Sequence, residues 1–279
     1  RSTLFPYTTL FRSLADVIID GSTALAGRSG VFAGDTQGTC TFSNCTNKAA
    51  VSAKNLDPAT GAPYTYGVPV GMPSGFVGQV KNGNLTFDDC VNAGPISIEG
   101  TFNSVYPGGF VSEFEFYSPS VTFNRCANTA DITNNATNSY GQRFSAGGFI
   151  GRNQYANPNM TFNQCYNSGA ISASAAAAGF CSSAGWGTWR FTDCYNIGSA
   201  TIGGAGGSAS GFIGAAKGKS YFTNCYNAGA LGAADGVDAS ACTIAAFETS
   251  PVKGHEITVE NSYWNSLPKI GRASCRERV

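Results

Sequence analysis

The chain has 279 residues, and its 17 Lys and Arg residues balance 17 Asp and Glu residues, so the formal net charge is +0. Only 12% of the residues are charged and 36 are glycine, a composition that excludes a mainly helical protein because Gly, Asn and Thr are poor helix formers. No run of Lys and Arg is present, which argues against binding to nucleic acid or to an anionic membrane, since both depend on clustered positive charge.

The two ends of the chain differ from the rest. Residues 3–13 resemble the in-frame translation of a short-read sequencing adapter, and residues 270–279 resemble its reverse complement. We therefore expect residues 1–13 and 269–279 to be foreign, and residues 14–268 to be a single repeat domain truncated at both ends. These ends hold six basic residues and one acid, so the remaining 11 basic and 16 acidic residues give the body a net charge of −5.

One phrase recurs seven times between these ends, with the form apolar-Thr-Phe, two polar residues, Cys, one variable residue and Asn. The copies are residues 40–47, 85–92, 121–128, 160–167, 189–196, 220–227 and the degenerate 257–264. Apolar residues alternate with Thr, as in a strand with one buried face, so Phe and Cys are expected to point inward and Thr outward.

Two further apolar stretches accompany each copy. A Gly-Phe phrase occurs at residues 30–34, 74–78, 109–111, 147–151, 178–181 and 210–214. An aliphatic residue follows the Cys by six positions, as in Val51, Ile96, Ile132, Ile171 and Leu231. Repetition at this interval is typical of stacked-repeat proteins. We predict an all-β, right-handed parallel β-helix of about seven turns with three short strands per turn.

Equivalent residues of successive turns should form three ladders. The interior Phe ladder comprises Phe42, Phe87, Phe123, Phe162, Phe191 and Phe222. The Cys ladder comprises Cys45, Cys90, Cys126, Cys165, Cys194 and Cys225. The Asn ladder comprises Asn47, Asn92, Asn128, Asn167, Asn196 and Asn227, and we expect it at a corner with left-handed backbone, with amides bonded between turns.

The chemistry of the cysteines has two interpretations. Inward thiols in register are most simply small buried apolar groups, whereas disulfides between adjacent turns are also geometrically conceivable. With one histidine and no Cys-x-x-Cys pattern, the sequence indicates no metal site and no cofactor.

The combination of Gly-Phe-Ile/Val-Gly with Asn/Asp-Cys-Tyr-Asn-x-Gly-x-Ile resembles the GLUG-type repeats of bacterial surface and secreted proteins. The resemblance covers nearly all of residues 14–268, with Phe where that family usually has Leu. It implies a β-helix at the cell surface or outside the cell, with a structural or adhesive role and no catalytic residues.

The best candidate for binding is an aromatic stripe that follows the Cys ladder in the later repeats, formed by Tyr166, Tyr195, Tyr226 and Tyr263. If the rings face outward, they can contact host or cell-wall glycans or a protein partner; the alternative is that they pack over the adjacent turn.

Evidence for catalysis is weaker. Glu113 and Glu115 would project from one strand face about 7 Å apart, as an acid–base pair acting on a sugar could, but the preferred interpretation is a solvated face opposite buried Phe114 and Phe116. His255 has no nucleophile in its sequence context and is expected to be a solvated turn residue. We therefore predict a noncatalytic extracellular module, an adhesin or rigid spacer without nucleic-acid binding or direct membrane insertion, with a polysaccharide-active β-helix enzyme as the alternative.

Overall fold

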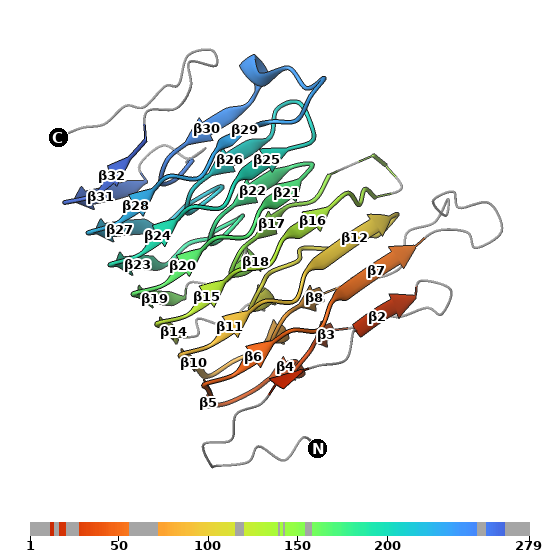
Figure 1. Cartoon of the computed structure of the whole chain (residues 1–279), viewed down its shortest axis with the longest axis vertical. Helices are drawn as coiled ribbons and strands as arrows, with labels where there is room; N and C mark the ends of the chain where they lie inside the picture. The colour runs from red at the N-terminus through yellow and green to blue at the C-terminus, as the bar shows by residue number, and fades with distance from the viewer. Residues whose placement is uncertain are drawn as a thin grey trace.

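The computed structural model describes residues 12–13, 17–20, 28–55, 72–114, 120–138, 140–141, 143–153, 158–249 and 255–265. Its strands are stacked as rungs from the N-terminal turn to the C-terminal turn (Figure 1). All pairings between named strands are parallel and join each strand to its counterpart one turn away. The predicted parallel β-helix is therefore confirmed, and the one helical element among the described residues is a 3-10 turn, η1 (Ala239–Ala241).

The recurring Thr-Phe segment forms a seven-stranded sheet, which we call the Phe sheet. It consists of β5 (Cys40–Ser43), β10 (Asn84–Asp88), β14 (Ser120–Asn124), β19 (Asn159–Asn163), β23 (Thr188–Thr192), β27 (Lys219–Thr223) and β31 (Glu256–Glu260). Its register aligns each Phe with the next, as in Phe87 with Phe123 and Phe123 with Phe162.

The dipeptide that ends in the ladder Asn forms a separate, eight-stranded Asn sheet. It consists of β1 (Arg12–Ser13), β6 (Thr46–Asn47), β11 (Val91–Asn92), β15 (Ala127–Asn128), β20 (Tyr166–Asn167), β24 (Tyr195–Asn196), β28 (Tyr226–Asn227) and β32 (Tyr263–Trp264). Of the two ends predicted to be foreign, residues 1–13 and 269–279, the structure describes only β1, which pairs with β6.

The aliphatic stretch forms the seven-stranded Ile sheet. It consists of β2 (Val17–Asp20), β7 (Val51–Asn55), β12 (Ile96–Gly100), β16 (Ile132–Asn134), β21 (Ile171–Ala173), β25 (Ala200–Ile202) and β29 (Leu231–Ala233).

The Gly-Phe phrase is a bend between two sheets. Before the bend lie β3 (Arg28–Gly30), β8 (Met72–Ser74), β17 (Ala146–Gly147), β22 (Ala176–Ala178), β26 (Ser208–Ser210) and β30 (Thr243–Ala245). After it lie β4 (Ala33–Thr36), β9 (Val77–Val80), β13 (Val111–Phe114) and β18 (Ile150–Arg152). Turns such as β6–β10 and β15–β19 thus have five short strands, because two of the three predicted stretches are each divided by a bend.

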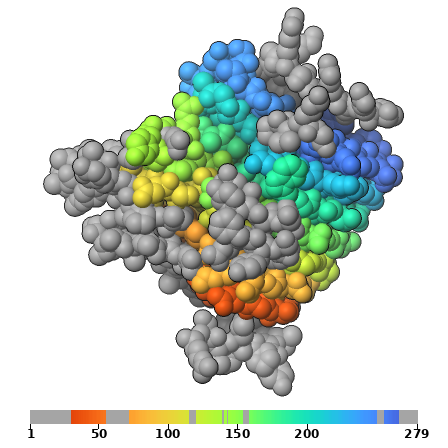
Figure 2. Space-filling view, turned by 180° about the vertical axis from the view of Figure 1, so that it is seen from behind, coloured from red at the N-terminus to blue at the C-terminus, as the bar shows by residue number. Residues whose placement is uncertain are grey.

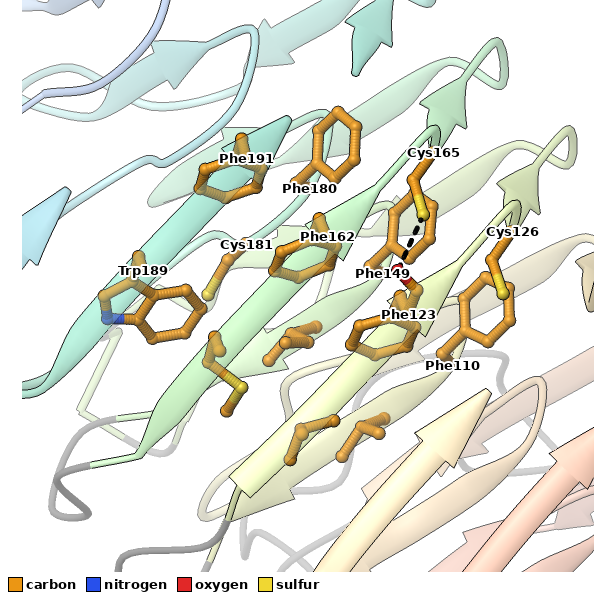
Figure 3. Packing of buried hydrophobic residues seen from close by; sticks show 14 of the residues in the cluster. Phe110, Phe123, Cys126, Phe149, Phe162, Cys165, Phe180, Cys181, Trp189 and Phe191 are labelled. Atoms are coloured by element: carbon orange, nitrogen blue, oxygen red, sulfur yellow. Dashed lines mark hydrogen bonds between the residues drawn. The ribbon is translucent and has the colours of Figure 1, made fainter. Parts of the chain in front are cut away.

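Two cores run the length of the cylinder. The first core contains the Phe ladder, the ladder thiols and a second column of Phe rings from the Gly-Phe bends. Within each column, successive rings stack about one strand spacing apart, as Phe162 and Phe191 do with centroids 4.7 Å apart. Rings of the two columns meet edge to face, as Phe149 and Phe162 do at 5.6 Å (Figure 3). Phe42 is half-buried in the first described turn of this sheet, and the other five ladder rings are fully buried.

The second core lies between the Ile sheet and the strands before the bend and is built from aliphatic side chains such as Ile96, Ile132 and Ile171. Seen from behind, the turns form successive bands of the surface from the N-terminal to the C-terminal end (Figure 2). Successive turns therefore present equivalent outer positions along the Phe, Asn and Ile sheets.

Candidate binding surface

The corner that leads into the Asn sheet has left-handed backbone in every turn. The residue directly before the ladder Cys, or before Ser262 in the last turn, has a φ between 48° and 54°: Asn44, Asp89, Arg125, Gln164, Asp193, Asn224 and Asn261. The expectation that the ladder asparagines themselves occupy this corner is wrong. They lie three residues later in extended strands, where side-chain alternation points their amides inward.

The ladder asparagines form an unbroken chain of buried amides. Each Nδ2 donates to the Oδ1 of the next turn at 2.7–2.8 Å, from Asn47 through Asn92, Asn128, Asn167 and Asn196 to Asn227. The same Nδ2 also donates within its own turn, as Asn128 does to the Ala130 carbonyl at 2.9 Å. The chain satisfies polar groups inside the protein and fixes the strands of the Asn sheet in register.

This amide chain explains why the two repeated phrases occur together. The Gly directly before the Phe of the Gly-Phe bend faces the ladder amide, so a Cβ on Gly148 would lie 2.7 Å from Asn167 Oδ1 and 2.0 Å from the Gly179 carbonyl oxygen. Only glycine permits this approach. The bend and the ladder therefore contact each other and separate the two cores.

Because side chains alternate along a strand, the residue before each ladder Asn points outward. The four stripe tyrosines occupy this position in consecutive turns and in register. Tyr195, Tyr226 and Tyr263 are 37%, 39% and 68% exposed, and Tyr166 is half-buried. The structure thus brings all four together on the outer face, whereas Ala127 in the preceding turn is buried.

The rings of the stripe are not arranged uniformly. Tyr166 and Tyr195 stack with centroids 4.9 Å apart and planes 2° from parallel, so they also cover each other's turns. Tyr226 instead donates from its hydroxyl to Asn265 Oδ1 at 3.3 Å, in the following turn. Partial burial and the neighbouring Tyr166 raise the pKa of Tyr195, so its hydroxyl is neutral at physiological pH.

A second outward-facing column lies beside the stripe and is formed by the residue two positions after the stripe position in each turn. It contains Ser168, Ile197, Ala228 and Asn265, whose N–H groups each donate to the ladder Asn of the preceding turn. Ile197 is 50% exposed. The last turns thus carry a small mixed patch of tyrosine, aliphatic and amide groups.

Charges lie at the edges of the face. Arg125 contacts Asp89 through two hydrogen bonds of 2.7 and 2.8 Å, and the bond from Arg125 lowers the pKa of Asp89. Asn124 donates to Asp88 and accepts from Asn163, which forms a half-buried row of hydrogen-bonded side chains along the Phe sheet. Sequence reasoning missed this row and the ion pair, because their partners are 36 or 39 residues apart.

The nine described cysteines are free thiols, so the structure shows the buried-thiol interpretation and not the disulfide alternative. Each ladder Sγ from Cys90 onward lies 3.3–3.5 Å from the Phe carbonyl oxygen of the preceding turn, as Figure 3 shows for Cys165 and Phe123. Cys90 Sγ interacts with Cys126 and is largely buried, and its pKa is raised to about 12. Cys90 is therefore a structural group rather than a nucleophile.

The remaining acid–base candidates are not assembled into a site. Glu113 is buried and pairs with Arg152, whose guanidinium also lies 3.7 Å from the centre of the Tyr106 ring, while Glu115 lies outside the described residues. The expectation of a solvated His255 is wrong: its side chain is 4% exposed and pairs with Glu248. Within the described part of the chain, no group of three or more His, Cys, Asp or Glu residues could hold a metal ion.

No family model matches the chain. No curated protein matches it either. Among solved structures, it is similar to the crystal structure of a "putative immunoglobulin A1 protease" from Bacteroides ovatus, with a TM-score of 0.47, 15% identity, and coverage of 82% of this chain and 70% of the other. In the residues that the structure describes, no helix is long and apolar enough to cross a membrane.

Proposed function

We propose that this chain is a noncatalytic β-helical module of a bacterial cell-surface or secreted protein, and that it holds a partner-binding face at a fixed distance from its attachment point. The observation that carries the proposal is the stripe of four tyrosines in register on the outer face of the Asn sheet. Such a row of partly exposed aromatic rings is typical of binding surfaces.

Rigidity supports the same role. The Asn ladder, the stacked rings and the thiol contacts each join one turn to the next, so bending the cylinder would disturb all three. Seven turns at the spacing of paired strands make a rod about 30 Å long. A module of this kind is suited to act as a spacer that presents its own side surface.

The arrangement of acids and bases favours binding over catalysis. Glu113 is paired with Arg152, Asp89 with Arg125 and Glu256 with Lys219, and Arg125 lowers the pKa of Asp89. A polysaccharide-active enzyme needs one carboxyl group whose pKa is raised so that it can act as an acid.

The test compares the wild-type chain with a variant in which all four stripe tyrosines are serine. Biolayer interferometry would measure binding to immobilised bacterial cell-wall polysaccharides, mucin glycoproteins and extracellular-matrix proteins. We expect the wild type to bind at least one of these surfaces and the variant to lose that binding.

The control is Tyr221→Ser, because Tyr221 is a half-buried aromatic residue on the outer face of the Phe sheet, away from the stripe. Binding by the wild type that survives loss of all four stripe rings would refute the proposed face. Release of sugar products from any of the polysaccharides would refute the noncatalytic role.

A further inference from the structure

The tyrosine stack stops at Tyr195, although the register would allow it to continue. Tyr195 and Tyr226 are direct neighbours in the Asn sheet, as Tyr166 and Tyr195 are. Among the described residues, however, ring contacts in the stripe join only Tyr166 to Tyr195, and Tyr226 reaches toward Asn265 in the opposite direction. One flat face of Tyr195 therefore has no ring stacked on it.

Small and apolar groups border this free face. Ile197 lies two residues after Tyr195 in the same turn, and Ala228 takes the equivalent position in the next turn. Ile197 is 50% exposed and Ala228 is half-buried, so both side chains are at least partly accessible from solvent. Beyond Ala228 lie the Tyr226 hydroxyl and the Asn265 amide, which supply hydrogen-bonding groups at the edge.

We infer that the site bounded by Tyr195, Ile197, Ala228 and Tyr226 binds one uncharged hexopyranose unit of a glycan, with the sugar ring in the place of the missing aromatic ring. A pyranose has one face of C–H groups that fits against an aromatic face, and hydroxyls around its edge. The apolar residues match the first feature, and the Tyr226 hydroxyl and Asn265 amide match the second.

Local charge selects against acidic sugars. Asp193 is the corner residue two positions before Tyr195, and Glu260 ends β31 three residues before Tyr263. A uronic or sialic acid at the site would meet like charge, whereas a neutral sugar would not. The inference rests on the proposed binding face and names the chemical class of its partner.

The test uses the whole chain on an array of neutral and acidic oligosaccharides, followed by titration of the best neutral ligand. Ala228→Leu fills the site but leaves every tyrosine in place, so we expect it to weaken binding at least about tenfold. Tyr195→Ala removes the stacking face and should weaken binding by a similar factor. Ala93→Leu is the matched control, because Ala93 is an exposed residue of the same column in an earlier turn, beside no tyrosine; it should leave affinity within about twofold.

The outcomes separate this inference from the proposed function. Neutral-glycan binding that Ala228→Leu weakens and Ala93→Leu does not supports the site. Stripe-dependent binding to a protein or to acidic glycans alone overturns the inference and leaves the proposed function standing. If Ala228→Leu has no effect on neutral-glycan binding, the sugar does not occupy this site. Absence of any stripe-dependent binding overturns both.

Discussion

Replacing Asn128 with alanine should destabilise the protein more than replacing Asn227, although both are buried members of the same ladder. Asn128 accepts from Asn92 and donates to Asn167 and to the Ala130 carbonyl, so its loss leaves three buried groups without these partners. At about 1–3 kcal/mol for each orphaned group, partly relieved by relaxation, Asn128→Ala should cost about 3–6 kcal/mol. That is a large part of the stability of an ordinary domain.

Asn227 is the last member of the chain and accepts a single ladder bond, from Asn196. Asn227→Ala should therefore cost about 1–2 kcal/mol. Urea unfolding, followed by far-UV circular dichroism and by the fluorescence of buried Trp189, would measure both variants. Equal effects for the two, or a cost below about 1 kcal/mol for Asn128→Ala, would show that the ladder bonds do not act as described.

Asn128→Asp provides a test with unchanged shape. A carboxylate can accept from Asn92 but cannot donate to Asn167 Oδ1, so burial and the facing oxygen should raise its pKa above the unfolded value. The folded state then binds the proton more tightly than the unfolded state, and stability falls as the pH rises through and above the unfolded pKa. We expect this variant to be more stable at pH 4 than at pH 7 relative to the wild type measured at each pH; the opposite dependence would refute the donor assignment.

Three further predictions follow from buried groups. Phe162→Asp places a charge between two stacked rings and should abolish cooperative thermal unfolding, measured by circular dichroism; an unchanged melt would contradict the interior Phe column. Iodoacetamide at pH 8 should modify half-exposed Cys242 well before Cys90, because Cys90 is buried and its pKa of about 12 keeps it protonated. Peptide mapping by mass spectrometry would measure both rates, and equal rates would show that the turns open readily. Burial lowers the pKa of His255, but contact with Glu248 outweighs burial, so the pKa is raised in the folded state. The stabilisation that protonated His255 contributes is therefore complete below the unfolded pKa of about 6.5 and is lost as the pH rises through the folded pKa. His255→Gln should remove the part of the decline in melting temperature between pH 6 and pH 8 that this titration causes.

The fold could be predicted because every turn repeats the same short-range pattern. Alternation of Thr with Phe fixed which face of the Phe sheet is buried, and recurrence of Cys-x-Asn fixed the order of the ladders. The second Phe column was not predicted, although Phe110, Phe149 and Phe180 recur as regularly, because the sequence does not show which bend faces which strand.

The predicted site was less complete than the predicted fold. The position of the stripe followed from strand alternation, but the different ring orientations of Tyr195 and Tyr226 depend on side-chain rotamers and on Asn265 in another turn. The left-handed corner was placed three residues too late because Asn is common both in such corners and in buried amide ladders. The burial of His255 depends on Glu248, whose role the local sequence does not indicate.

The contact between glycine bend and amide chain has a consequence for how such a protein can change in length. The bonds that a ladder Asn makes to other ladder members reach only the turn above and the turn below, and successive members are separated by 29 to 45 residues. Deleting the 29 residues that separate Asn167 from Asn196 would bring Asn167 against Asn227, with matching glycines, rings and thiols on either side. Unequal recombination between repeats can therefore shorten or lengthen the rod by whole coils, and each product inherits interfaces that already fit.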